Sequence, residues 1–246
     1  MITIKTDEQI ALMRDSGRIT KNVLDLIGRE IRAGMTTKDI DKLAYEYITA
    51  CGAYPSFLGY SGYPASVCVS VDEMVVHGIP TEDFVIREGQ IVSVDVGAFK
   101  NGFNGDAART FCVGNVEPET RRLVEVTKQS FFEGIKDICV GSAIGDIGYQ
   151  VQTYAESNGF SVVREMTGHG IGRKLHEDPE VRNYGKRGTG IRLREGMTLA
   201  VEPMINMGGY QVDIDGWKCV TRDGKPSAHY ENTIVITANG VEILTL

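Results

Sequence analysis

The sequence matches itself when it is shifted by 107 residues, and this repeat is the strongest constraint on the fold. Two helices followed by strands are expected in each copy, so the order of elements repeats as well. We therefore predict an internal duplication, with repeats at approximately residues 6–113 and 114–246, inside a single α+β domain over residues 1–246 that has a pseudo-twofold axis. The shift aligns five identical pairs: Gly34 with Gly141, Asp39 with Asp146, Ile40 with Ile147, Tyr47 with Tyr154, and Gly52 with Gly159.

Apolar spacing and capping signals predict the helices. Thr6 and Gln9 have the form of a capping box at the start of a long first helix. The second helix is expected at about residues 36–52, because its apolar residues recur on one helical face. Two further helices are expected at about residues 118–135 and 144–159, and strands with glycine-rich turns occupy most of the remaining chain.

The composition limits the class of protein. Of the 246 residues, 42% are hydrophobic and 24% are charged, which is ordinary for a globular protein. The formal net charge is -7 and no basic stripe carries interleaved aromatics, so we expect no nucleic-acid partner. No signal segment and no apolar run of ~18 residues occurs, so we expect a cytoplasmic protein that does not contact membranes. The five cysteines show no paired spacing and are expected to be reduced.

Acidic residues stand next to apolar segments, where a buried carboxylate is costly unless it has a partner. Asp95 interrupts the apolar run at residues 91–96, and Glu202 directly follows the apolar residues 197–201. Asp106 comes eleven residues after Asp95, behind a glycine-rich turn. This spacing suits a hairpin that brings both carboxylates to one point. Taken alone, each of these acids is more often a turn or surface residue than a metal ligand.

His169 and Glu231 complete a set of five candidate metal ligands. His169 has glycines on both sides, which permit a close backbone approach, and neutral imidazole is a common metal ligand. Glu231 directly precedes a predicted hairpin strand. Two divalent cations would balance the four carboxylates, and this oxygen-rich set suits Mn, Fe(II), Co or Zn in a hydrolytic site. The candidate ligands are Asp95, Asp106, His169, Glu202 and Glu231.

Two further histidines lie in loop-like segments, where catalytic groups are common. His77 precedes Gly78 and Pro80, and His176 precedes Pro179. Without the ligand set, a hydrogen-bonded loop histidine is the preferred interpretation of either residue. With it, both are candidates for contact with a substrate.

These residues, with four short motifs, resemble the methionine aminopeptidases of the bacterial, type I kind. The resemblance covers nearly the whole chain. It implies the pita-bread fold, whose pseudo-twofold α+β architecture agrees with the internal repeat, and it implies a dinuclear metallo-hydrolase. The motifs are VHGIP at 76–80, TGHGIG at 167–172, LHEDP at 175–179 and VEP at 201–203.

The resemblance implies a role for each candidate ligand. Asp106 and Glu231 would each bridge two divalent metal ions. Asp95 would bind at one side of the pair, while His169 and Glu202 would complete the coordination of one ion. The identity of the metal stays open among Co, Mn, Fe(II) and Zn.

The resemblance also implies three catalytic residues. A hydroxide activated by the two metals would attack the methionine carbonyl, and Glu202 would handle the proton. His176 would stabilise the tetrahedral oxyanion, and His77 would hydrogen-bond the scissile amide.

A methionine pocket is implied as well. Phe57 stands where a small residue such as cysteine is common in the family, and Leu175 stands where phenylalanine is common, so bulk has moved from one wall to the other. For Tyr60, Tyr63 and Trp217, the alternative interpretation is that they are ordinary half-buried aromatic residues. Beside His77 and His176, the implied substrate-binding residues are Phe57, Tyr60, Tyr63, Cys68, Leu175 and Trp217.

The function implied by the resemblance is removal of the initiator methionine from nascent polypeptides when the second residue is small. The substrates would be the N-termini of new chains, near the ribosome, and we expect a monomer. Two alternatives remain open. An Xaa-Pro peptidase of the same fold usually carries an additional N-terminal domain, for which 246 residues leave no room. A pita-bread protein that has lost catalysis and only binds partners would not need all five ligands and both histidines.

Overall fold

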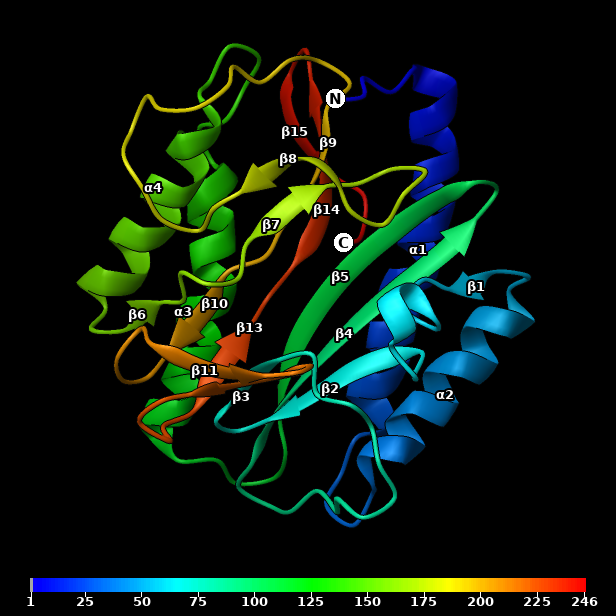
Figure 1. Cartoon of the computed structure of the whole chain (residues 1–246), viewed down its shortest axis with the longest axis vertical. Helices are drawn as coiled ribbons and strands as arrows, with labels where there is room; N and C mark the ends of the chain where they lie inside the picture. The colour runs from blue at the N-terminus through cyan, green and yellow to red at the C-terminus, as the bar shows by residue number, and fades with distance from the viewer. Residues whose placement is uncertain (1) are drawn as a thin grey trace.

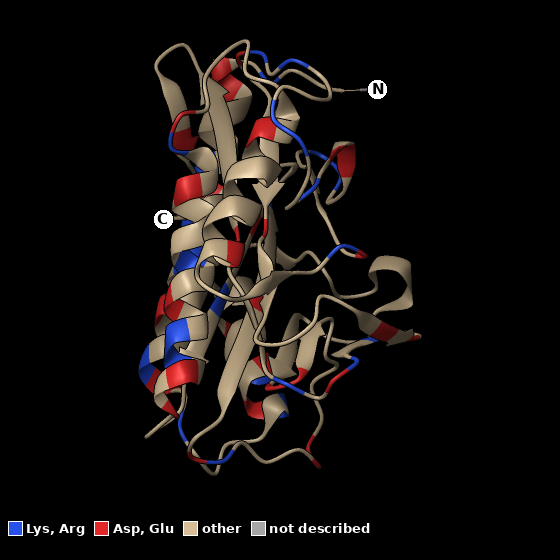
Figure 2. Cartoon of the chain, turned by 90° about the vertical axis from the view of Figure 1, so that its left-hand side faces the viewer, with Lys and Arg blue, Asp and Glu red and all other residues tan. Residues whose placement is uncertain are grey.

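The computed structural model describes residues 2–246 and contains two pairs of helices packed on strands (Figure 1). Figure 2 shows the helices on one side of the strands and long connections on the other. Among the helices of residues 2–246, none combines the length and the apolarity that crossing a membrane requires. The α-helices are α1 (Asp7–Glu30), α2 (Thr37–Ala50), α3 (Pro118–Ile135) and α4 (Ile144–Ser157), and a short 3-10 helix covers Tyr60–Gly62.

The capping signals of the sequence fix the helix ends. Thr6 Oγ1 accepts a hydrogen bond from Gln9 N at 3.3 Å, and Gln9 Oε1 accepts one from Thr6 N at 3.1 Å. Thr36 caps α2 in the same way. Gly52, with a φ of 65°, follows the end of α2 in the left-handed conformation that glycine adopts at little cost. The four predicted helices are confirmed.

The strands form four small sheets. Their orders are β1-β4-β2 with β5 on the other edge of β4, β13-β10-β6, β11-β12-β3, and β15-β14-β9-β7-β8. The strands of the first half are β1 (Tyr54–Pro55), β2 (Val67–Val71), β3 (Met74–Val76), β4 (Ile91–Lys100) and β5 (Phe103–Cys112). Those of the second half are β6 (Ser161–Val162), β7 (Gly168–Gly170), β8 (Glu177–Val181), β9 (Thr198–Val201), β10 (Met204–Asn206), β11 (Val212–Asp215), β12 (Lys218–Thr221), β13 (Ser227–His229), β14 (Asn232–Thr237) and β15 (Gly240–Ile243).

The two halves repeat each other in three dimensions at the same shift of 107 residues. Each half places a helix pair behind its strands, and backbone contacts recur between equivalent residues. This supports the predicted duplication, while the repeat boundaries at 6–113 and 114–246 stay a prediction. The recurring contacts are Gly34 N to Ile86 O and Gly141 N to Leu193 O, both at 2.9 Å, and the isolated bridges Thr36 with Val85 and Ala143 with Arg192.

Each half has its own core between helices and strands. In the first half, Val92, Val94 and Val96 of β4 are buried against α1 and α2. Burial of each such side chain contributes on the order of 1.5–3 kcal/mol, so this face fixes the register of β4. Successive side chains alternate between faces, and Asp95 is therefore turned to the opposite face, away from the helices.

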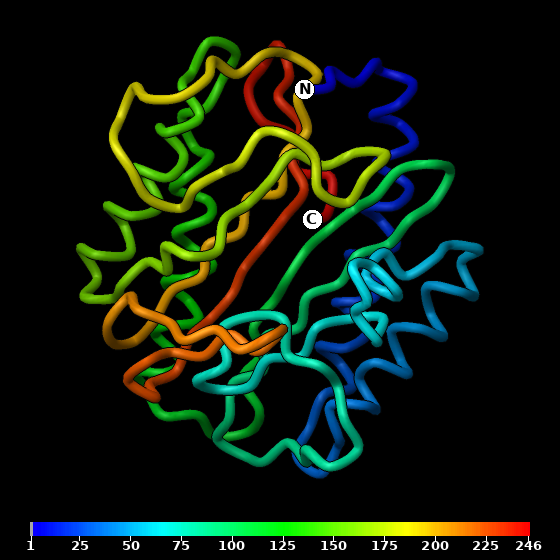
Figure 3. The backbone as a smooth tube through the Cα atoms, viewed as in Figure 1, coloured from blue at the N-terminus to red at the C-terminus, as the bar shows by residue number. Residues whose placement is uncertain are grey.

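The halves meet where β5 runs beside the residues that lead into β14 (Figure 3). Ala108 N donates to Glu231 O at 3.3 Å, and Glu231 N donates to Ala108 O at 3.0 Å. Thr233 Oγ1 accepts from Asp106 N and donates to Asp106 O, both at 2.9 Å. This seam brings acids that are more than a hundred residues apart into adjacent positions.

Two glycines without room for a side chain let α1 pack closely on its neighbours: Gly17 faces the C-terminal segment, and Gly105 of β5 faces α1. A Cβ on Gly17 would lie 2.2 Å from Leu244 O, and a Cβ on Gly105 would lie 2.7 Å from Gly17 N. Thr20 Oγ1 also donates to Gly105 O at 3.0 Å. Since backbone atoms are the obstacles, a side chain at Gly17 would push α1 away from the C-terminal segment, and one at Gly105 would push α1 away from the strand that carries Asp106.

We predict that Gly17→Ala lowers the free energy of unfolding by about 1–3 kcal/mol, because a methyl group would meet backbone. Gly28→Ala in the same helix is the matched control. Its nearest obstacle is the edge of the Phe111 ring at 2.9 Å, which can shift, and alanine favours the helix by roughly 0.5–1 kcal/mol. Denaturant unfolding of both variants checks this, and equal losses would contradict the close contact.

Candidate metal centre and active site

The β4–β5 hairpin brings Asp95 and Asp106 together. Gly97 pairs with Asp106 and Asp95 pairs with Ala108, so the two acids are diagonal neighbours on one face. This confirms the hairpin expected from their spacing. The opposite face of β4 packs on the helices, and the acids therefore point into the space between the halves.

His169 is the central residue of the short strand β7. A Cβ on Gly168 would lie 2.3 Å from Ala200 O, and one on Gly170 would lie 2.1 Å from Asp178 O, so only glycine fits on either side. His169 Nδ1 lies 2.9 Å from Gly170 O. A proton on Nδ1 satisfies this contact and leaves Nε2 as the atom that can bind a metal.

Glu202 and Glu231 approach each other through the antiparallel pair β9 and β14. Glu202 directly follows β9 and Glu231 directly precedes β14, and their neighbours Val201 and Asn232 are paired across the sheet. The hairpin strand expected after Glu231 is confirmed. Both glutamates therefore lie at one end of this strand pair, next to the seam with β5.

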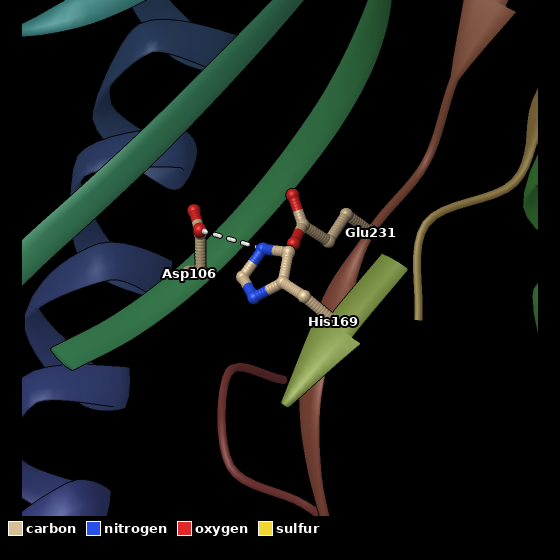
Figure 4. Close-up of side chains that lie close together, drawn as sticks. All are labelled: Asp106, His169 and Glu231. Carbon is tan, nitrogen blue, oxygen red and sulfur yellow. Dashed lines mark ion pairs between the residues drawn. The ribbon is translucent and has the colours of Figure 1, made fainter. Parts of the chain in front are cut away.

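The side chains converge from both halves of the chain. Oxygen and nitrogen atoms of Asp106, His169 and Glu231 lie within 4.8 Å of one another (Figure 4). His169 Nε2 lies 3.9 Å from Asp106 Oδ2 and 3.7 Å from Glu202 Oε1. Asp95 lines the same cavity. All five candidate ligands of the sequence are thus brought to one place.

This carboxylate cluster has no cation among residues 2–246 to balance it within the cavity. Asp95 Oδ1, Asp106 Oδ1 and Glu231 Oε1 are buried without a hydrogen-bond partner there. Burial raises the pKa of Asp95 to about 7 and of Glu202 to about 8. Burial, followed by the neighbouring carboxylates, also raises the pKa values of Asp106 and Glu231 well above the ordinary range.

The histidines around the cluster are neutral near pH 7. Burial lowers the pKa of His169 to about 3, and those of His77 and His229 to about 4. Burial also lowers the pKa of His176. Carboxylate oxygens without hydrogen-bond partners and a neutral imidazole nitrogen can all donate electron pairs to a divalent cation. The donor set therefore fits a metal centre.

A cavity of about 280 Å³ joins the cluster to an aromatic pocket. Tyr63 and Trp217 pack edge to face with ring centroids 5.2 Å apart, and Trp217 also faces His77 at 6.0 Å. Phe57, Tyr63, Cys68 and Leu175 belong to one buried apolar cluster. The lining includes every residue expected from the sequence: Phe57, Tyr60, Tyr63, Cys68, His77, Leu175, His176 and Trp217.

His77 and His176 face the cavity from opposite connections. His77 has a φ of 62°, a left-handed conformation that is uncommon outside glycine and clusters at functional sites. His176 Nδ1 lies 2.7 Å from the Tyr60 hydroxyl, and its ring centroid is 4.1 Å from that of His169. Both histidines line the cavity with the carboxylates, where the His77 ring contacts Trp217 and the His176 ring contacts Tyr60.

Sequence reasoning missed two residues behind the cluster. His229 Nε2 lies 3.6 Å from Glu202 Oε2, and its position two residues before Glu231 was the only available signal. Arg109 donates to Glu231 O at 2.6 Å and to Thr245 O at 3.2 Å. Its guanidinium also lies 4.3 Å from the ring centroid of Tyr230. Arg109 ties the backbone of a candidate ligand to the C-terminal segment.

Comparison with known proteins identifies the family. Residues 11–238 match the profile of metallopeptidase family M24. The chain belongs to this family. It is 52% identical to methionine aminopeptidase from Clostridium perfringens, with 100% of this chain and 99% of the relative covered.

Solved structures give the same result. The crystal structure of methionine aminopeptidase from Rickettsia prowazekii superimposes with a TM-score of 0.98 at 42% identity, covering 100% of both chains. Prolidase from Pyrococcus furiosus has a TM-score of 0.81 at 22% identity, covering 99% of this chain and 65% of that one, which shows a shared fold alone. The pita-bread fold is confirmed, and the chain groups with the methionine aminopeptidases of family M24.

The raised carboxylate pKa values predict how pH affects the metal-free protein. The folded state binds the protons of Asp95 and Glu202 more tightly than the unfolded state, so stability falls as pH rises toward about 8. Below about pH 6.5 the histidines oppose this trend, because their lowered pKa values favour the folded state as pH rises. The clear window is therefore about pH 6.5 to 8.

We expect the melting temperature of the chelated protein to fall across this window. With Mn²⁺ or Co²⁺ bound, the carboxylates are ionised throughout and the slope should be much smaller. Thermal melts with and without metal check this. Parallel slopes in the two states would contradict a metal centre at the carboxylates.

Proposed function

We propose that the protein is a metal-dependent aminopeptidase that removes an N-terminal methionine when the second residue is small. The observation that carries the proposal is one cavity of about 280 Å³ that combines the five ligand side chains with an aromatic pocket. The identity of 52% to methionine aminopeptidase from Clostridium perfringens supports the same substrate.

The five ligand-type residues would hold two divalent ions, drawn from Co, Mn, Fe(II) and Zn. Asp106 and Glu231 would each serve both ions, as the resemblance to the methionine aminopeptidases implies. Asp95, Asp106 and Glu231 each have one buried oxygen without a hydrogen-bond partner among residues 2–246, which supports a cation at all three. Asp95, His169 and Glu202 would complete the set that holds the ions, and His169 Nε2 lies 3.7 Å from Glu202 Oε1. The bound ions would supply Lewis acidity that polarises a carbonyl and makes water a stronger nucleophile at neutral pH.

The aromatic pocket would select methionine by its shape and polarisability. A thioether packs favourably against aromatic edges and sulfur, and Tyr63, Trp217 and Cys68 offer such surfaces. Phe57 and Leu175 add apolar surface to the lining, and both are less than a tenth exposed.

The two loop histidines would act on the peptide as neutral hydrogen-bonding groups. A Tyr60 hydroxyl that donates to His176 Nδ1 leaves the proton of His176 on Nε2, where it can stabilise the developing oxyanion. His77 would hydrogen-bond the scissile amide, and Trp217 packs beside its ring. Glu202 would accept the proton of the attacking water and pass it to the leaving amine.

The substrates would be the N-termini of nascent polypeptides in the cytoplasm, close to the ribosome, and the protein would act as a monomer. An Xaa-Pro peptidase is the second candidate, because the prolidase from Pyrococcus furiosus has the same fold. Its lower identity of 22%, against 42% for the Rickettsia prowazekii enzyme, favours methionine removal.

Peptide assays test the proposal directly. We expect the metal-loaded protein to release methionine from Met-Ala-Ser but not from Met-Leu-Ser, and to leave Ala-Pro-Gly intact. Asp106→Asn should lose activity and weaken metal affinity by more than about 100-fold together, because a bridging carboxylate serves both ions. Asp15→Asn, at a surface ion pair with Arg18, is the matched control. Cleavage of Ala-Pro-Gly would favour the second candidate, and full activity in chelator would exclude the metal mechanism.

Substitution of His77 distinguishes a catalytic role of this residue from a structural one. If it hydrogen-bonds the scissile amide, His77→Ala should lower kcat by roughly 10²–10⁴-fold without loss of bound metal. His77→Asn should behave similarly, since asparagine tolerates the left-handed backbone at this position. Steady-state kinetics and metal analysis check both variants. Unchanged kcat, or loss of metal, would show that His77 has another role.

A further inference from the structure

A second cavity, of about 680 Å³, opens beside the candidate active site. Figure 1 shows the N-terminal segment, the β7–β8 connection and the β4–β5 turn meeting at this end of the molecule. His176 lines both cavities, so the two meet at this residue. The other lining residues are Thr3, Ile4, Lys5, Gln9, Phe103, Arg173, Lys174, Glu177 and Asp178.

Some charged side chains of this second cavity form an ion pair with each other, and others do not. Lys5 Nζ lies 2.6 Å from Glu177 Oε2, and both side chains are about nine-tenths buried or more. Burial acts to raise the pKa of Glu177, but hydrogen bonds from Lys5 and Thr3 lower it overall, so the pair is internally neutral. Arg173 and Lys174 are exposed, and within residues 2–246 neither forms an ion pair with an acid.

Neighbouring side chains hold the segment that carries Arg173 and Lys174. The Arg173 guanidinium lies over the ring of Phe103, 4.6 Å from its centroid. Asn104 Nδ2 donates to Gly172 O at 3.0 Å and to Arg173 O at 3.2 Å. Lys174 N donates to Glu177 Oε1 at 3.2 Å. These contacts order the segment, so Arg173 would lose less conformational entropy on binding a ligand than an unrestrained surface arginine would.

We propose that this cavity is a downstream substrate subsite in which Arg173 and Lys174 select acidic side chains at about the third to fifth residue of the peptide. The inference rests on the proposed function. An extended chain advances ~3.3–3.6 Å per residue, so these residues would lie roughly 7–14 Å beyond the scissile carbonyl. His176, which would contact the reacting carbonyl, stands at the junction where the peptide passes from one cavity to the other.

A carboxylate is the favoured ligand because of the chemistry of the two side chains. A guanidinium binds carboxylates with two parallel hydrogen bonds, and Lys174 adds a second positive charge beside it. Asp178 is the acid in the lining other than Glu177. The whole chain carries a net charge of -7, so the two positive charges of Arg173 and Lys174 are a local exception. They would attract acidic peptides and repel basic ones.

The test compares three amidated peptides, Met-Ala-Gly-Glu-Glu, Met-Ala-Gly-Gln-Gln and Met-Ala-Gly-Lys-Lys, with the metal-loaded enzyme. We expect kcat/KM for the acidic peptide to exceed that for the basic one by roughly three- to tenfold at low ionic strength, the size expected for two exposed pairs. The difference should shrink in high salt. The double variant Arg173→Gln/Lys174→Gln should bring the ratio close to one.

Lys186→Gln/Arg187→Gln removes two exposed charges outside both cavities and should keep the wild-type ratio. Lys174→Gln alone, which leaves the Phe103 contact intact, should lower the ratio partly. Equal rates on all three peptides, or a preference that survives in the double variant, would overturn the subsite while methionine release continued. Failure to cleave even Met-Ala-Gly would overturn the proposed function itself.

Discussion

Burial of four carboxylates in one cavity is the constraint on which the rest of the structure depends. Asp106 and Glu231 are almost fully buried, and each keeps an oxygen without a hydrogen-bond partner among residues 2–246. Such a cluster is unfavourable by itself, since burial and mutual repulsion both raise the pKa values of its members. Divalent cations relieve both costs, so the stability of the fold and its chemistry are coupled through the same atoms.

The segments that carry the acids are fixed by hydrogen bonds and packing, which opposes the repulsion between the carboxylates. Two hydrogen bonds join Ala108 to Glu231 across the seam, and Arg109 binds the Glu231 carbonyl from behind. The α1 helix packs directly on β5 at Gly105, one residue before Asp106. Ligands fixed in this way need little rearrangement when a metal binds, which favours a reproducible geometry for catalysis.

Much of the fold could be predicted because its signals are local. Thr6 and Thr36 form the capping contacts that their sequence positions predict, and the glycine turn at residues 101–102 joins two strands that carry Asp95 and Asp106 on one face. The repeat was also readable, since the same backbone contacts require the same glycines in both halves. The pairing of β5 with the residues before β14 had no such local signal, because it joins segments more than a hundred residues apart.

By itself the sequence determined which residues could bind metal and the outline of the fold, because an acid within an apolar strand needs a partner and helix periodicity is a property of neighbours. Only the tertiary structure decided how these residues meet. It brought His229 to within 3.6 Å of Glu202, set Arg109 behind Glu231, and opened the cavity lined by Arg173 and Lys174 beside His176. Those contacts depend on how the two halves of the chain pack against each other, and that packing is a sum of many long-range contacts that no short stretch of sequence contains.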